Sequence, residues 1–573
     1  MVGSGTASLR GGTFDLGEQG KTPRDRWTRR AFGRGWRGWG ELALLAGALA
    51  SGVALRLHQI QAQIPCDDEW HALETVAYRT PAWIATHFGY ADYSIPLTLY
   101  DVLVARLVGL DELGLRLPVV AAGILALFLL PLLVRPWFGA KTSVVLAWLL
   151  AVSPLHIYFS RYARPYSIAF LAATVGVLAF LRWTEGRRLH WGVVWAACAA
   201  IGPWFHLLML PFLAAPGAWA LFQARRGRAL PPHFFAVSGA AVLLLALLVG
   251  PPMVIDRAAL ADRAGLEGIQ LRSLLPAFEL FSGAQEPLLA FAVGLALVAG
   301  AIHLRHAAPA AWRYLLFLGA AQLAALFIAR PAALSVAIVL ARYMLPALLL
   351  FLLAVAAGLG VLDRRLRREW RWIPPHAASV ALVAGLLAFG PLLSLHSPPN
   401  RTYFVPNAWT NHGLYQYQYA QGARAIWSKA CCYPLRLPPV YREIARVAGP
   451  DDIVLEAPWF PYWHCNPFPF YQKLHRRPML IGYVTPPGEP LRFGELAPRD
   501  ERLRFRSFVH VADLPALRRA GVRYVVFHRD LAAEMTQVME LPRPEVERWI
   551  ERYRRLVGPP WRDDGAVCVF DLR

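Results

Sequence analysis

The sequence predicts a polytopic α-helical membrane protein of about eleven transmembrane helices, followed by a small α/β domain on the outer face. Hydrophobic residues make up 56% of the 573 residues and charged residues only 17%, which is too apolar for an ordinary soluble multidomain protein. Apolar runs of roughly 20 residues, the length that crosses a bilayer core, recur as far as about residue 395. Beyond that point, Pro, Tyr, Trp and charged residues interrupt the apolar pattern.

The apolar runs place the predicted helices. Their approximate ranges are 42–60, 117–134, 142–158, 166–183, 190–205, 207–223, 232–252, 287–303, 312–330, 343–361 and 374–395. A basic tail precedes the first run without a small-residue cleavage site after it, which favours an uncleaved transmembrane helix over a signal peptide. The segment 93–110 is interrupted by Asp101 and Arg106, so we expect an amphipathic helix on the outer interface.

The net charge of +21 is distributed along the chain in a pattern that predicts topology. Basic residues gather in alternate gaps between the apolar runs, namely 1–40, 135–141, 182–188, 225–228, 305–313 and 364–371. This distribution follows the positive-inside rule and argues against a nucleic-acid-binding patch. The predicted order is therefore a cytoplasmic tail (1–40), a transmembrane domain (41–395) with a first outer loop at 61–116, and a periplasmic domain (396–573).

Short β-like runs predict the α/β character of the last domain. They cover 452–456, 522–528 and 565–571, and the helical stretch 514–520 ends before Gly521, a typical helix C-cap residue. No C-x-x-C pair is present, so neither a zinc ribbon nor a thioredoxin-like motif is indicated. Cys465 either forms a disulfide with one of the adjacent residues Cys431 and Cys432 or remains a free thiol, and the sequence leaves both possibilities open.

Three consecutive acidic residues mark the first outer loop, which holds eight acidic residues against three basic ones. These are Asp67, Asp68 and Glu69, followed by His71. A carboxylate close to the membrane surface can act as a general base by accepting the proton of an attacking hydroxyl. The structural alternative is a solvated acidic turn or a helix N-cap.

Two arginines and an aromatic residue follow Ser153-Pro154 at the outer boundary, where basic residues run against the topology rule. Arg161, Arg164 and Tyr166 are joined at the same predicted level by Arg342-Tyr343 and by His206. A guanidinium group is suited to binding phosphate, although pairing with the acidic loop or contact with lipid headgroups is a structural alternative. Ionisable groups from distant parts of the chain thus converge on one membrane face, which is typical of a functional site.

At these residues the sequence resembles the GT-C glycosyltransferases related to protein O-mannosyltransferases and lipid A aminoarabinose transferases. The resemblance covers roughly residues 40–360. It rests, in order, on Asp68-Glu69, Leu115-Arg116-Leu117-Pro118, Ser153-Pro154, Tyr158, Ser160, Arg161, Arg164, Pro165, Tyr166, His206 and Arg342-Tyr343. The sequence departs from the relatives at Phe205-His206-Leu207, where they carry Thr-His-Tyr, and at Ile95-Pro96-Leu97, where they often carry paired prolines.

The resemblance implies an inverting transferase that uses a sugar on polyprenyl phosphate and an envelope glycan, lipid or protein acceptor. In that scheme Asp68 is the general base, and Asp67 and Glu69 substitute for it, orient it or bind a divalent metal, whose participation stays open. Arg161, Arg164 and Arg342 would hold the departing phosphate. The Arg- and Ala-rich composition points to a bacterial inner membrane. A transporter or flippase and a non-catalytic envelope assembly factor are the rival classes.

Overall fold

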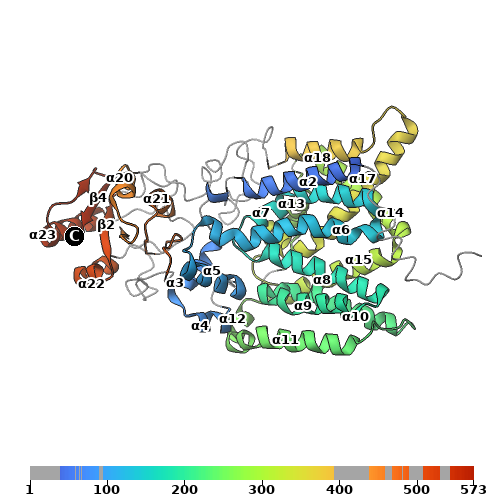
Figure 1. Ribbon diagram of the computed structural model, residues 1–573, viewed down its shortest axis with the longest axis horizontal. Helices are drawn as coiled ribbons and strands as arrows, with labels where there is room; N and C mark the ends of the chain where they lie inside the picture. Colours follow the sequence, from blue (N-terminus) through green and yellow to red (C-terminus); the bar gives the residue numbers. More distant parts are fainter. Residues whose placement is uncertain are drawn as a thin grey trace, which may run out of the picture.

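The computed structural model describes residues 39–58, 60–62, 65, 68–88, 94–266, 268–284, 286–390, 392, 438–458, 468–480, 482–488, 508–529 and 543–573. Residues 1–38 of the predicted N-terminal tail, Asp67 and the cysteines at 431, 432 and 465 lie outside these ranges, and the last two residues of that tail begin the first helix. Figure 1 shows a bundle of roughly parallel helices with a smaller domain, which contains the C-terminus, at one end of it.

Within the described residues, eight helical segments are long and apolar enough to cross a membrane. They are α2 (Trp39–Leu57), α6 (Glu112–Val152), α8 (Tyr166–Gly186), η3 with α10 (Leu207–Ala224), α11 (Phe234–Ile255), α14 (Pro287–Ala307), α15 (Pro309–Ala329) and η4 with α17 (Leu345–Glu369). Two shorter apolar helices are α9 (Leu189–Phe205) and α18 (Ala377–Phe389). The prediction of a polytopic helical membrane protein is confirmed.

Helix α6 accounts for two of the predicted spans. Its 41 residues would extend about 60 Å as one straight helix, twice the thickness of a bilayer core. The chain instead breaks at Gly139, whose φ of 83° is readily adopted only by glycine. The hydroxyl of Ser143 donates to the carbonyl of Pro131 at 2.5 Å, so the two halves fold back on each other as a hairpin. Each of the eleven predicted spans therefore corresponds to a helical segment.

Several short helices gather at the end of the bundle that faces the smaller domain (Figure 1). They include α3 (Glu69–Tyr78), α4 (Pro81–Thr86), α5 (Ile95–Leu107), α12 (Arg257–Asp262) and, near α3, η2 (Ile60–Ala62). Helices α7 (Pro154–Ser160), α13 (Leu271–Ser282) and α16 (Ala337–Tyr343) are also short. Helix α5 occupies the segment predicted to be amphipathic, and it buries Asp101 while exposing Leu103 and Leu107. The predicted site residues that the structure describes lie in α3 and α16, at the start of α8, or in segments next to α3, α7 and η3.

The C-terminal domain contains a four-stranded mixed sheet. The strands are β1 (Ile453–Ala457), β2 (Val522–His528), β3 (Arg562–Asp563) and β4 (Val567–Asp571), in the order β1-β2-β4-β3. Only β1 and β2 are parallel. The helices are α20 (Val440–Val447), α21 (Phe468–His475), α22 (Leu514–Arg519) and α23 (Arg543–Val557), with the 3-10 turn η8 (Val509–Val511).

The three predicted strands of this domain are confirmed, as is the end of the helix before Gly521, whose φ is 83°. The sequence did not predict β3. This strand has two exposed residues, so it lacks the apolar pattern by which a strand is recognised.

Candidate active site

Asp68 lies at the start of α3 with its side chain turned away from the helix end. It occupies the N-cap position without making a side-chain capping hydrogen bond. Its backbone N–H donates to the hydroxyl of Tyr162 at 3.1 Å. One carboxylate oxygen, Oδ2, accepts from Nη1 of Arg342 at 3.1 Å and lies 4.0 Å from Nη2 of Arg164, while Oδ1 lies 3.9 Å from Nδ1 of His71. Three sequence segments far apart in the chain thus meet at one carboxylate.

Arg164 and Arg342 are the cationic part of this cluster. Arg164 lies between α7 and α8 with a side chain only 5% exposed. Arg342 is the residue before the last in α16, and its side chain is 20% exposed. Burial lowers the pKa of each guanidinium. Neighbouring groups, Tyr166 and Asp68 among them, raise it by a larger amount, so the pKa of each arginine lies above its ordinary value. Both arginines are therefore charged.

The charges of the cluster do not balance. Nε and Nη1 of Arg164 and Nε of Arg342 are buried without a hydrogen-bond partner in the described structure. Among the residues that the structure describes, two guanidinium groups share the carboxylate of Asp68, which leaves one surplus positive charge and three unpaired nitrogen atoms within that set. Because a buried, uncompensated charge is costly, this arrangement is suited to receiving an anion.

Aromatic side chains surround the two arginines. The Arg342 guanidinium lies 5.6 Å from the ring centre of Tyr166 and 5.1 Å from that of Tyr343, within cation–π range. The His206 ring, at the turn between α9 and η3, lies 5.2 Å from Tyr166 and 5.9 Å from Tyr343. Burial, together with Arg342 and Arg164, lowers the pKa of His206 to about 3, so its imidazole is neutral.

Glu69 points away from this cluster although it is adjacent to Asp68. Its carboxylate is 1% exposed and accepts two hydrogen bonds from Arg116, from Nε and Nη2, each at 3.0 Å. It also accepts from the backbone N–H of Ala163 at 2.7 Å. Glu69 therefore joins α3 to α6 and to the segment that carries Arg164. The sequence motif included Arg116, but its partner was not predicted because 47 residues separate the pair.

Arg161, a predicted phosphate ligand, contacts the end of a neighbouring helix. Its Nη1 donates to the carbonyl oxygens of Leu55, Arg56 and His58, at 3.2, 3.0 and 2.8 Å, and so binds the C-terminal end of α2. Tyr162, which orients the backbone at Asp68, was missed by sequence reasoning. A tyrosine among the aromatic residues of this stretch gives no signal of that role.

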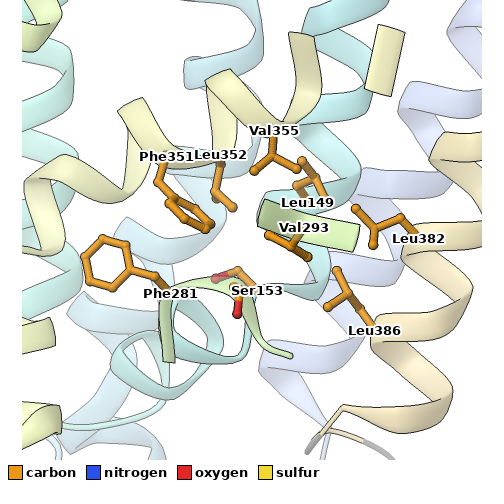
Figure 2. A pocket seen from close by; sticks show the side chains of 10 residues that line it. Leu149, Ser153, Phe281, Val293, Phe351, Leu352, Val355, Leu382 and Leu386 are labelled. Atoms are coloured by element: carbon orange, nitrogen blue, oxygen red, sulfur yellow. The ribbon is translucent and has the colours of Figure 1, made fainter. Parts of the chain in front are cut away.

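No metal centre is evident in the part of the chain that the structure describes, where no group of three or more His, Cys, Asp and Glu side chains has a suitable arrangement. Figure 2 shows a separate pocket inside the bundle. Eight apolar residues and two serines line it, namely Leu149, Phe281, Val293, Phe351, Leu352, Val355, Leu382, Leu386, Ser153 and Ser282. Without a charged side chain, this pocket is not suited to a phosphate, which distinguishes it from the arginine cluster.

Comparisons with known proteins agree with the sequence motifs. Residues 100–251 match the family model described as dolichyl-phosphate-mannose-protein mannosyltransferase. The chain is 26% identical over 182 residues to "Putative mannosyltransferase YycA" of Bacillus subtilis (strain 168), a match that spans 31% of this chain and only 26% of that relative's length.

Among solved structures, the chain is similar to ArnT from Cupriavidus metallidurans bound to undecaprenyl phosphate. The identity is 13%, with 93% of this chain and 98% of that chain covered and a TM-score of 0.49. It is also similar to the Archaeoglobus fulgidus oligosaccharyltransferase, at 12% identity, with 86% and 70% covered and a TM-score of 0.42. The family-model match agrees with the resemblance to GT-C glycosyltransferases, and residues 100–251 are similar to the dolichyl-phosphate-mannose-protein mannosyltransferase family.

Proposed function

We propose that the protein is an inverting glycosyltransferase that moves a sugar from polyprenyl phosphate to an envelope glycan, lipid or protein acceptor. The observation that carries this proposal is the buried Arg164–Arg342 pair, with its surplus positive charge and unpaired nitrogen atoms beside Asp68. A phosphate diester monoanion has the charge that this cluster lacks. The family match over residues 100–251 supports the same class of reaction.

In the proposed reaction, an acceptor hydroxyl attacks the anomeric carbon of the donor sugar opposite the phosphate. A new carbon–oxygen bond forms, the bond from the anomeric carbon to the phosphate oxygen breaks, and the configuration at that carbon inverts. Asp68 takes the hydroxyl proton. The departing phosphate gains negative charge, which Arg164 and Arg342 stabilise because they are already in place and shielded from water.

The rings of Tyr343 and Tyr166 both lie within cation–π range of the Arg342 guanidinium and contribute by holding it in place. The neutral His206 lies beside both rings, and its buried Nδ1 has no hydrogen-bond partner in the described structure. His206 can therefore form a hydrogen bond with a bound sugar donor without adding a charge to the site. Nδ1 of His71 lies 3.9 Å from the second carboxylate oxygen of Asp68, at the edge of the site.

The distribution of basic residues supports an outer, periplasmic location for the site in a bacterial inner membrane. Arg342 lies just before η4 and α17, and the other end of α17 carries the basic cluster that begins at Arg364. The 22 residues of α17 extend about 33 Å, enough to cross the bilayer core. In Figure 1 the C-terminal domain lies at the opposite end of the bundle from the basic end of α17. With the basic end in the cytoplasm, Asp68 and the C-terminal domain face the periplasm.

The test uses purified protein in lipid with a panel of radiolabelled polyprenyl-phosphate sugars and envelope extracts. We expect release of free polyprenyl phosphate from at least one donor, and loss of that release in Asp68→Asn. Asp262→Asn, which changes an exposed carboxylate on α12, is the matched control and should retain activity. If no donor is consumed, or if Asp68→Asn is as active as the control, the proposed function is wrong.

A further inference from the structure

Three side chains of the C-terminal domain converge on one buried carboxylate of the membrane domain. Glu112, the first residue of α6, is fully buried. It accepts hydrogen bonds from Nη1 of Arg476 at 2.7 Å, from the hydroxyl of Tyr483 at 3.0 Å and from Nζ of Lys473 at 3.1 Å. A carboxylate at the N-terminus of a helix is also favoured by the helix dipole. The contact is therefore specific and is shielded from solvent.

Backbone hydrogen bonds reinforce this contact. Leu110 and Thr485 exchange two, with the N–H of Thr485 donating at 2.9 Å and the N–H of Leu110 at 3.2 Å. The N–H of Gly488 donates to the carbonyl of Ala105 on α5 at 3.3 Å. Gly109 has a φ of 84°, and a Cβ atom there would lie 2.5 Å from the carbonyl oxygen of Thr485. Only glycine accommodates so close an approach, so the turn between α5 and α6 is built to receive this segment.

The same contact leads directly to the candidate active site. Arg116 lies one turn after Glu112 on α6 and holds Glu69, the residue next to Asp68. Tyr483 packs edge-to-face against Trp70, with ring centres 6.3 Å apart and an interplanar angle of 83°. Trp70 is 1% exposed. Two sets of contacts, through Arg116 and through Trp70, therefore connect the C-terminal domain to α3.

We propose that residues 471–480 and 482–488 of the C-terminal domain position the first outer loop for catalysis, with Glu112 and Tyr483 as positioning residues. This inference rests on the proposed function, in which Asp68 must face both the acceptor and the arginine pair. Neither residue contacts the cluster directly. They hold α3 and the start of α6 so that the Asp68 carboxylate keeps its distance from Arg164 and Arg342.

Tyr483→Phe and Glu112→Gln test the proposal with little change in side-chain size. Small displacements of a reacting group lower turnover steeply, so we expect kcat to fall roughly tenfold or more in each variant. The KM for the donor should stay within about twofold, because the arginine pair itself is unchanged. The control is Arg562→Gln, which removes an exposed ion pair with Glu443 in the same domain and should leave kcat unchanged. Unchanged kcat in both test variants would overturn the proposal.

A covalent link provides a second, independent measurement. Leu110 and Thr485, whose backbones are directly hydrogen-bonded, are replaced with cysteines in the Tyr483→Phe background. Oxidation of the two thiols to a disulfide should restore at least part of the lost kcat. Restored turnover separates positioning from a general loss of stability. A cross-linked variant as slow as its reduced form would overturn the proposal.

Hydrogen exchange separates this proposal from the proposed function. We expect the α3 amides of Glu112→Gln to exchange at least several-fold faster than those of the unmodified protein and of Arg562→Gln. If the unmodified protein transfers no sugar but α3 exchange still rises, the proposed function fails and the structural coupling stands. If transfer is observed and neither exchange nor kcat changes, the positioning role fails and the proposed function stands.

Discussion

Asp68→Asn should bind polyprenyl phosphate more tightly while losing turnover. The Asp68 carboxylate lies 3.1 Å from Nη1 of Arg342. A phosphate bound on the other side of that guanidinium would lie roughly 8 Å from the carboxylate, since two hydrogen bonds and the width of the guanidinium separate them. At that distance two negative charges repel each other by about 1–2 kcal/mol at an effective dielectric constant of about 20–40. Removing the carboxylate charge should therefore lower the Kd about fivefold to thirtyfold.

The assay is equilibrium binding of polyprenyl phosphate in lipid nanodiscs, for the unmodified protein, Asp68→Asn and the control Asp262→Asn. Turnover is measured in parallel and should fall by about 10²–10⁴, the usual contribution of a general base. Weaker phosphate binding in Asp68→Asn would refute the electrostatic reasoning. It would mean that Asp68 favours phosphate binding, by holding the two arginines in position, more than its negative charge repels the phosphate.

Three further predictions follow from individual contacts. Arg164→Ala should raise the donor KM and lower kcat together, since a phosphate contact acts in both the ground state and the transition state; unchanged steady-state kinetics would assign this arginine to structure. Glu69→Gln should destabilise the protein by about 3–5 kcal/mol, because it leaves the buried Arg116 without its charged partner, and a thermal unfolding scan that shows no drop in Tm would contradict this. The C-terminal domain should become easier to cleave by protease as the pH falls from about 6.5 towards 5. Burial lowers the pKa of His475 to about 3 and that of His510 to about 4, so only the unfolded domain takes up these protons, at about 1.4 kcal/mol per group per pH unit. Constant protease resistance over this range would contradict the prediction.

The number and position of the membrane helices were predictable from the sequence because these properties depend on local chemistry. A helix must satisfy its own backbone hydrogen bonds in the bilayer, so a run of about 20 apolar residues is sufficient to indicate it. The same holds for the strand at 522–528, whose apolar run follows a helix and a glycine in the left-handed region. The chain reversal at Gly139 was also located correctly, since the basic gap at 135–141 separated the two apolar runs that α6 joins.

The assignment of roles within the site depended on the tertiary structure. By composition, Asp68 and Glu69 are equivalent candidates for a base, and Arg161 and Arg164 are equivalent candidates for phosphate binding. Glu69 is engaged with Arg116 and Arg161 with the end of α2, whereas Asp68 and Arg164 face each other. The role open to a charged side chain depends on which oppositely charged groups and carbonyl oxygens it already binds.

The sequence by itself therefore determined the membrane class, the helices, the presence of strands in the C-terminal part and the set of candidate ionisable residues. Only the tertiary structure decided which of those residues share a cluster, that the cluster carries a surplus positive charge, and that Glu112 joins the C-terminal domain to the first outer loop. Hydrophobic length and periodicity are properties of neighbouring residues in the chain. Charge balance and hydrogen-bond satisfaction arise between residues as far apart as Asp68 and Arg342, so they exist only once the chain has folded.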